Sequence, residues 1–348
     1  MIKIENVSKD LGEFLLRDVS LDINDGEYFM ILGPTGVGKT ILLETIAGIY
    51  RPDSGRIFLD GKDITNIPPR ERNIGMVYQD YTLFPFLTVE ENIGFGLKLR
   101  KIGKREIKHE VDELANLLDI SHLLHRYPGT LSGGEQQRSA IARALILEPN
   151  VLLLDEPLSA LDVQTAERLR QELKKVHSVI KTTMIHVTHS FEEAFLLSSR
   201  MAVMNKGEIV QEGRPNEVFR KPNSEFVAGF LGVDNLFQGE SAIKNGIAYV
   251  DVGGVNIAST TLKSGDVYAS IRPEDILVST KQIVSSARNS LQGRIEGIVD
   301  KGTVVRILVS VGDTPFVVIV TKQSFDDMEL RKNMSVYITF KASIVHIF

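Results

Sequence analysis

The sequence of 348 residues contains no cysteine and no long apolar run. The lack of cysteine excludes disulfides, thiolate zinc sites and a cysteine nucleophile, and it favours a reducing compartment. The longest apolar stretches, such as residues 307–311, are far shorter than the about 18 residues that a membrane span needs. Met1 opens a strand-like run without a signal-peptide pattern. We therefore expect any role at a membrane to depend on another chain.

A strongly basic character is also absent. The 40 Lys and Arg residues are outnumbered by 45 Asp and Glu residues, which gives a formal net charge of −5. This disfavours duplex DNA as the main ligand, because phosphate neutralisation favours a basic protein. No nucleic acid partner is expected. The remaining composition is that of an ordinary globular protein, and the length suggests two domains.

Two kinds of sequence pattern meet near residue 235. Before it, continuous apolar runs at residues 29–32, 151–154 and 184–187 alternate with amphipathic helical patterns, which indicates a parallel sheet covered by helices. After it, short alternating segments are punctuated by Gly, Asp and Pro, which is typical of small antiparallel barrels. The sequence predicts an α/β domain over residues 1–233, a helix-containing linker at about 214–235, and an all-β domain over 235–348.

Each domain has a further internal division. Residues 80–130 have no strong strand signal and carry apolar residues at helical spacing, which predicts a helical subdomain. In the tail, residues 235–239 resemble residues 289–293, and residues 267–272 resemble 336–341. Two pairs in the same order suggest a duplicated unit whose second copy is about 15 residues longer. Chance similarity between strands is the alternative.

A phosphate-binding loop is predicted at residues 33–40, which fit the pattern G-x-x-x-x-G-K-[ST] between a strand and a helix. Its glycines let the backbone turn tightly and aim N–H groups inward, and the helix N-terminus adds a partial positive charge. Lys39 would meet the β and γ phosphates of ATP, and the Thr40 hydroxyl would ligate Mg²⁺. The predicted loop consists of Gly33, Pro34, Thr35, Gly36, Val37, Gly38, Lys39 and Thr40.

Acidic residues follow a second predicted strand. Asp155 and Glu156 end the run at residues 151–154, at the carboxyl edge of the sheet where the phosphate loop also lies. Asp155 suits Mg²⁺ through a water, and Glu156 suits polarising the attacking water. His189 ends the next strand, where an imidazole can hold the γ phosphate or the water. The alternatives are an acidic turn before Pro157 and a structural histidine.

A second anion-binding helix start is predicted at residues 131–138, which read Leu-Ser-Gly-Gly-Glu-Gln-Gln-Arg and precede a helix. One chain then has two edges that face phosphate. If each nucleotide meets the loop of one chain and the Ser132 and Gly134 turn of another, two chains close head to tail around two ATP molecules.

Together these motifs resemble the ATP-binding subunit of an ABC transporter over residues 1–233, in that family's order and spacing. Residues 131–138 match the family signature, Gln79 the Q-loop, residues 159–162 the D-loop and His189 the switch histidine. The resemblance implies that Gln79 senses the γ phosphate and Mg²⁺ and relays this to a helical subdomain docked on a permease. It also implies an aromatic adenine contact, but Leu11 occupies that position, and Phe14 is the alternative.

Motifs in residues 235–348 indicate which kind of ABC transporter the sequence resembles. Residues 271–274 resemble a string found in the regulatory tails of importer ATPases, and residues 285–289 with 340–343 resemble the oxyanion-binding Mop module of molybdate importers, regulators and storage proteins. A tetrahedral dianion offers four acceptor oxygens. The residues that would meet it are Ser286, Arg288, Lys341 and Ser343. The alternative is that Arg288 and Lys341 are surface charges on barrel strands.

The resemblance implies an α/β P-loop ABC ATPase with a helical subdomain, followed by an OB-like Mop/TOBE tandem barrel. It implies a homodimer at the cytoplasmic face of the membrane that uses ATP and Mg²⁺. The expected partners are two permease subunits and, indirectly, an extracytoplasmic binding protein. The expected cargo is molybdate or tungstate, which would also inhibit from inside. Alternatives are a sulfate or sugar importer, a soluble ABC ATPase in DNA repair or translation, and a non-catalytic oxyanion store or sensor.

Overall fold

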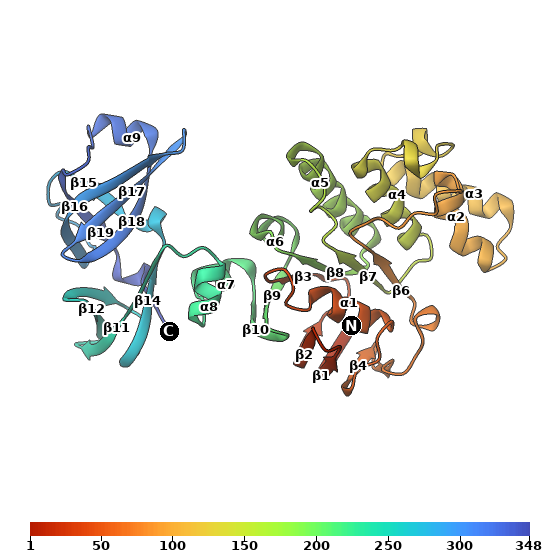
Figure 1. The fold of residues 1–348 in the computed structure, drawn as a ribbon, viewed down its shortest axis with the longest axis horizontal. Coiled ribbons are helices and arrows are strands. Elements are labelled where there is room, and N and C mark those ends of the chain that lie inside the picture. The colour runs from red at the N-terminus through yellow and green to blue at the C-terminus, as the bar shows by residue number, and fades with distance from the viewer. The chain divides into compact units, whose positions relative to one another are not determined.

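The computed structural model describes residues 1–348, which form two compact units, Met1–Val218 and Phe219–Phe348 (Figure 1). The division lies inside the stretch 214–235 that the sequence predicts as a linker. None of the helices combines the length and apolar character that crossing a membrane needs. The helices are α1 (Lys39–Ala47), α2 (Val89–Leu99), α3 (Lys104–Leu117), α4 (Gly133–Leu145), α5 (Val163–Ile180), α6 (Phe191–Leu197), α7 (Pro215–Arg220), α8 (Glu225–Phe230) and α9 (Lys322–Asp327).

Most of the remaining regular structure is strand, together with five 3-10 turns. The first unit contains β1 (Ile2–Asp10), β2 (Leu15–Ile23), β3 (Tyr28–Leu32), β4 (Ser54–Leu59), β5 (Lys62–Asp63), β6 (Ile74–Val77), β7 (Val151–Asp155), β8 (Thr183–Thr188), β9 (Arg200–Asn205) and β10 (Glu208–Gly213). The second contains β11 (Asn235–Lys244), β12 (Ile247–Val252), β13 (Val255–Ser259), β14 (Gly265–Ile271), β15 (Leu277–Ser279), β16 (Asn289–Asp300), β17 (Val304–Val311), β18 (Thr314–Thr321), β19 (Ser335–Phe340) and β20 (His346–Ile347). The 3-10 turns are η1 (Pro69–Glu71), η2 (Ser121–Leu123), η3 (Pro128–Thr130), η4 (Pro273–Asp275) and η5 (Ala342–Ile344).

The first unit is built on two sheets with α1 between them. A six-stranded sheet has the order β10-β9-β3-β8-β7-β6, parallel except for β10, and a four-stranded antiparallel sheet has the order β2-β1-β4-β5. Every residue of β3, β7 and β8 is buried, which explains their continuous apolar runs. Ile41, Leu42 and Ile46 of α1 share one buried cluster with strands of both sheets.

The parallel sheet gathers the predicted catalytic residues at one edge. β8 lies between β3 and β7, and β6 pairs with β7 on the far side. The segments that follow these four strands therefore leave from the same carboxyl edge. They carry Gly33 after β3, Gln79 after β6, Glu156 after β7 and His189 after β8.

The stretch between β6 and β7 contains helices and no strand. Figure 1 shows α2, α3 and α4 gathered in one part of the first unit, where α2 contacts both α3 and α4. The helical prediction is confirmed here. Helix α3 ends at Leu117, earlier than the spacing of apolar residues in the sequence suggests. Leu118 and Leu124, which continue that spacing, are buried although they lie after the helix.

The second unit consists of two five-stranded antiparallel sheets, β13-β12-β11-β14-β20 and β15-β19-β16-β17-β18, which share one buried apolar cluster. The two similar segment pairs occupy equivalent places. Asn235 of β11 pairs with Ile271 of β14, and Asn289 of β16 pairs with Phe340 of β19. The predicted repeat is confirmed, and α9 with longer strands makes the second copy longer.

The two copies are interlocked. β15 follows β14 but pairs with β19, and β20 follows β19 but pairs with β14, so each copy gives its last strand to the other sheet. The buried Asn235 amide exchanges two hydrogen bonds with the Val317 backbone, at 2.8 and 2.6 Å. The buried Asn289 amide does the same with Ala258, at 3.0 and 2.7 Å. The buried apolar residues of both copies belong to one shared cluster.

Candidate ATP site and oxyanion residues

Five residues of the phosphate loop line a cavity of about 560 Å³: Thr35, Gly36, Gly38, Lys39 and Thr40. Gly38 caps α1 with a left-handed backbone at φ 102°, and a Cβ on Gly33 would lie 2.5 Å from the Met204 carbonyl oxygen. Only glycine fits both positions without strain. Lys39 Nζ donates to the carbonyl oxygens of Gly33 and Pro34, at 2.8 and 2.9 Å. The ammonium thus holds the loop closed around the place where phosphate would bind.

Thr40, at the start of α1, and Asp155, at the end of β7, form a pair of oxygen ligands. The Thr40 hydroxyl lies 3.0 Å from each oxygen of the Asp155 carboxylate and donates to it. Burial raises the pKa of Asp155, and the Thr40 hydrogen bond opposes that effect. A hydroxyl and a buried carboxylate are the ligand types that Mg²⁺ prefers, and a cation here would offset the cost of burying the charge.

Glu156 is held by an unusual backbone. Its φ is 42°, a left-handed conformation that side-chain-bearing residues seldom adopt. Its N–H donates to the Val187 carbonyl at 3.0 Å, and its own carbonyl accepts from the Ser159 hydroxyl at 2.9 Å. These bonds keep the strained residue in place, so the carboxylate is aimed by the fold rather than by local preference.

The Glu156 carboxylate connects two other predicted residues. One oxygen lies 3.6 Å from Lys39 Nζ, and the other lies 3.2 Å from His189 Nδ1. Burial lowers the pKa of Lys39, while the charge of Glu156 acts in the opposite direction. His189 is about half exposed, whereas Lys39 is almost fully buried. The three side chains predicted from separate motifs therefore form one contiguous cluster.

Other cavity residues concern the nucleotide base and the Q-loop. Leu11 and Phe14 both line the cavity, so both remain candidates for the adenine contact. Gln79 lines it too, and so do Thr35 and Gly36. Gly33, Pro34 and Val37 lie outside its lining: the first two bind Lys39 through their carbonyls, and Val37 packs on the core.

Tyr50 was missed from the sequence although it lines the cavity. Glu44 was also missed: the Tyr78 side chain hydrogen-bonds to its carboxylate, and burial and the Asp155 charge raise its pKa. Glu44 lies in α1, and Tyr50 follows soon after its end. The sequence signals that could have revealed them are an acidic residue one helical turn after Thr40 and an aromatic residue two positions after Gly48.

A buried polar chain supports the segment that carries His189. The Tyr28 hydroxyl lies 2.9 Å from Nδ1 of His186, whose Nε2 lies 3.3 Å from Glu193 of α6. Burial opposes ionisation of Glu193, but its interactions with His186 and Thr188 outweigh this and hold its pKa below the ordinary value. Because β8 and α6 flank His189, this chain fixes both ends of its short connection.

Ser132 and Gly134 lie outside the cavity of their own chain. Ser132 caps α4 in a capping box with Glu135: its N–H donates to the Glu135 carboxylate at 2.7 Å, and its hydroxyl accepts from the Glu135 N–H. A Cβ on Gly134 would lie 2.5 Å from the Thr165 methyl group. The turn is therefore tightly packed and fixed, but a single chain does not bring it to the phosphate loop.

The predicted oxyanion residues lie on the surface of the second unit. Ser286 and Arg288 precede β16, and Lys341 and Ser343 follow β19, whose pairing of Asn289 with Phe340 brings the two ends together. All four side chains are exposed. No hydrogen bond or ion pair connects them with one another. Ser343 also faces a separate cavity, which Ser286, Arg288 and Lys341 do not line.

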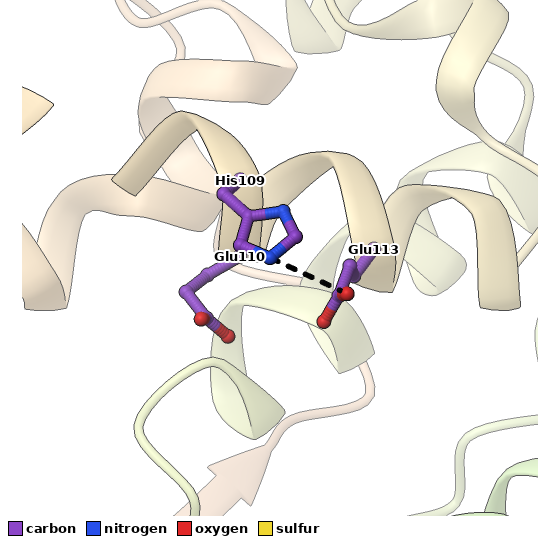
Figure 2. A group of neighbouring side chains, drawn as sticks. All are labelled: His109, Glu110 and Glu113. Atoms are coloured by element: carbon purple, nitrogen blue, oxygen red, sulfur yellow. Dashed lines mark ion pairs between the residues drawn. The ribbon is translucent and has the colours of Figure 1, made fainter. Parts of the chain in front are cut away.

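One further polar group lies on α3, away from the cavity residues. His109, Glu110 and Glu113 present ligand atoms within 4.8 Å of one another, and His109 pairs with Glu113 at 3.5 Å (Figure 2). His109 and Glu113 are largely exposed. This is an ordinary i, i+4 pair on a solvated helix face, and it adds nothing to the site.

A phosphate loop, a strand ending in Asp and Glu, and a histidine after the neighbouring strand define the class of P-loop ATPases of the ATP-binding cassette type. Comparison with known proteins gives the family. The ABC transporter family model matches residues 16–159, and the TOBE domain model matches residues 285–347. The molybdate/tungstate import ATP-binding protein of Pyrococcus horikoshii is 49% identical over 348 residues, covering both chains completely. The chain belongs to the ATP-binding proteins of the ABC transporter family.

Other relatives have different cargo in their names. The spermidine/putrescine import ATP-binding protein of Thermotoga maritima is 45% identical, covering 86% of this chain and 83% of its own. Among solved structures, a dimeric, post-hydrolysis ATP-binding cassette bound to ADP and Pi is 33% identical, with a TM-score of 0.56. It covers 62% of this chain and 99% of its own.

Proposed function

We propose that this ABC ATPase drives the import of molybdate or tungstate and is inhibited by the same oxyanion from inside the cell. Full-length identity of 49% to a molybdate/tungstate import protein carries the proposal. The duplicated β unit supports it, because Arg288 and Lys341 flank the paired residues Asn289 and Phe340 there. The ATPase half alone does not select the cargo, since relatives named for polyamine import are nearly as similar.

In the proposed hydrolysis, the cavity residues Lys39 and Glu156 and the adjacent His189, which lies outside the cavity lining, each have one task. Lys39 leaves the carbonyls of Gly33 and Pro34 to bind the β and γ phosphates. Its departure also frees the Glu156 carboxylate to accept a proton from the attacking water. His189, already 3.2 Å from Glu156, holds the γ phosphate or the water in line. Phosphoryl transfer of this kind depends mainly on position and charge, which the strand ends provide.

Thr40 and Asp155 would hold Mg²⁺, with Gln79 as a further oxygen ligand. The fit rests on their all-oxygen donor set and on the pKa of Asp155, which burial raises above its usual range. When bound, the ion would neutralise the charge of the phosphate oxygens. The same interaction would make Gln79 sensitive to ATP occupancy.

Two copies would complete each site. Ser132 and Gly134 form a rigid helix start that faces no phosphate within one chain. In a head-to-tail pair it would meet the γ phosphate bound by the partner's loop, because helix N-termini favour anions. ATP would then hold the dimer closed, and hydrolysis would open it.

The helical subdomain would dock on a membrane permease, and the chain would then lie at the cytoplasmic face of the membrane. Phe86 is 90% exposed and Phe84 41% exposed, and both lie between Gln79 and α2. Large apolar side chains exposed in this way are typical of a binding surface. An extracytoplasmic binding protein would deliver the cargo to that permease.

The test is the ATPase rate of the complex reconstituted with its permease, with added molybdate, tungstate or sulfate. We expect molybdate and tungstate to inhibit, and the Arg288→Gln/Lys341→Gln variant to lose this sensitivity while its basal rate is unchanged. Inhibition that persists in the variant would place the effector elsewhere. Inhibition by sulfate, without inhibition by molybdate or tungstate, would indicate that the cargo is sulfate.

A further inference from the structure

A second cavity, of about 130 Å³, lies within the β unit and is lined by an excess of positive charge. Arg220 and Lys221 reach it from the end of α7, and Arg272 reaches it from the end of β14. Asp275 is the one carboxylate in its lining. Three cations against one anion leave the walls with a net positive charge.

Arg272 is fixed in place without being neutralised. Its guanidinium donates to the backbone carbonyls of Phe219 and Leu231 and stacks on the Phe219 ring, 3.4 Å from the ring centre. Neither Arg272 nor Arg220 takes part in an ion pair within the usual 4 Å. Burial lowers the pKa of Arg272; the charges of Glu274 and Asp275 act in the opposite direction, and the like charge of Arg220 adds to the lowering. The guanidinium is thus partly buried without a carboxylate in direct contact, and a bound anion would offset the cost of burying its charge.

Hydroxyl donors complete the lining. Thr261, Ser270 and Ser343 all border the cavity, and Ser270 donates to the His346 carbonyl at 3.4 Å. His346 closes one side through a 3.0 Å hydrogen bond to the Pro222 carbonyl. The volume is about ten times what a single water needs, so a small anion with several acceptor oxygens fits. A long or flexible ligand does not.

We propose that this cavity binds a compact tetrahedral oxyanion of the phosphate, sulfate or tungstate class, held mainly by Arg220, Lys221 and Arg272. The bound anion links residues 219–222 to the end of β14 and to η5. Residues 219–222 directly follow the first compact unit, which ends at Val218. Occupancy therefore stiffens the connection from the ATPase unit to the β unit. The site is distinct from Arg288 and Lys341 and does not depend on the proposed cargo.

The test is isothermal titration of the full-length chain with sodium phosphate, sulfate or tungstate at constant ionic strength. Saturating Mg-ADP fills the part of the phosphate loop that holds ADP, and an anion bound at the empty γ position would bind both variants alike, because both keep the loop intact. We expect Arg220→Gln/Lys221→Gln to weaken binding of at least one anion by about tenfold, because two charge-assisted hydrogen bonds are lost. The matched control, Arg288→Gln/Lys341→Gln, keeps that binding.

Hydrogen exchange shows where the anion binds. The anion should slow exchange of the amides of residues 219–221 and 223 in the wild type and in the control variant, but not in Arg220→Gln/Lys221→Gln. The proposal is overturned if no anion binds the wild type, if both variants bind equally well, or if only Arg288→Gln/Lys341→Gln loses binding. The last result would leave the regulatory proposal standing, so the two ideas fail separately.

Discussion

At the scale of single residues, Glu156 determines how the resting site is organised. Its carboxylate lies between Lys39 and His189 and so provides the negative charge that a γ phosphate would otherwise supply. The strained backbone at φ 42° directs it there. In the proposed mechanism, ATP would displace Glu156 from Lys39, and the Glu156 carboxylate would then be free to act as the base.

Glu156→Gln should bind ATP at least as tightly as the wild type but lose its turnover about a hundredfold or more, because the general base is gone. Removing the carboxylate also removes a competitor for Lys39. Phosphate release measures the first effect and equilibrium binding of ATP the second. Glu192→Gln is the control, because Glu192 is exposed and lies three residues after His189. Hydrolysis at the wild-type rate in Glu156→Gln would disprove the base assignment.

The residues assigned to the ATP site were predictable because each belongs to a short motif next to a recognisable strand. Arg72 was not. Its guanidinium is buried and donates to backbone carbonyls of Thr45, Ile46, Thr65 and Ile67, and so holds the end of α1. An isolated arginine has no periodicity or spacing, and its partners are up to 27 residues away in sequence. Such contacts depend on the tertiary fold alone.

At the scale of elements, two asparagine side chains pair with strand backbone as a neighbouring strand would. Asn235 and Asn289 each donate to and accept from the backbone of the other copy's sheet, as a paired residue would. The repeat was visible in the sequence because both copies retain Asn and Gly at the same places. The exchange of β15 and β20 between the two sheets could not be predicted from the sequence. Strands with similar sequences do not show which strand each of them pairs with.

Asn235→Ala and Asn289→Ala should each destabilise the β unit by about 2–4 kcal/mol, because each leaves buried backbone groups unpaired. Urea denaturation, followed by hydrogen exchange of β13 and β18, measures this directly. Asn256→Ala, an exposed position on β13, is the matched control and should have little effect. Equal stability of all three variants would contradict the role assigned to the buried amides.

At the scale of the whole molecule, catalysis is expected to need two chains. Lys39 and Ser132 lie in one chain but in different surroundings, and only Lys39 borders the cavity. Local motifs revealed both residues. Their cooperation across a dimer cannot follow from one chain's contacts, so it stays a prediction.

Mixing two inactive variants tests this cooperation. Lys39→Ala and Ser132→Arg should each abolish hydrolysis alone. In a random mixture half of the dimers are mixed, and each has one intact site made from the Lys39 of one chain and the Ser132 of the other. About a quarter of wild-type activity should therefore return in a symmetric head-to-tail dimer. No recovery in a mixture shown to contain mixed dimers would refute the shared site.

The exchange of β15 and β20 has a consequence for biosynthesis. The sheet that begins with Asn235 is completed only by β20, at His346–Ile347. During translation, more than a hundred residues must leave the ribosome before this first sheet gains its last strand. The ATPase unit can therefore mature on the nascent chain while the β unit is still an open, unfinished structure.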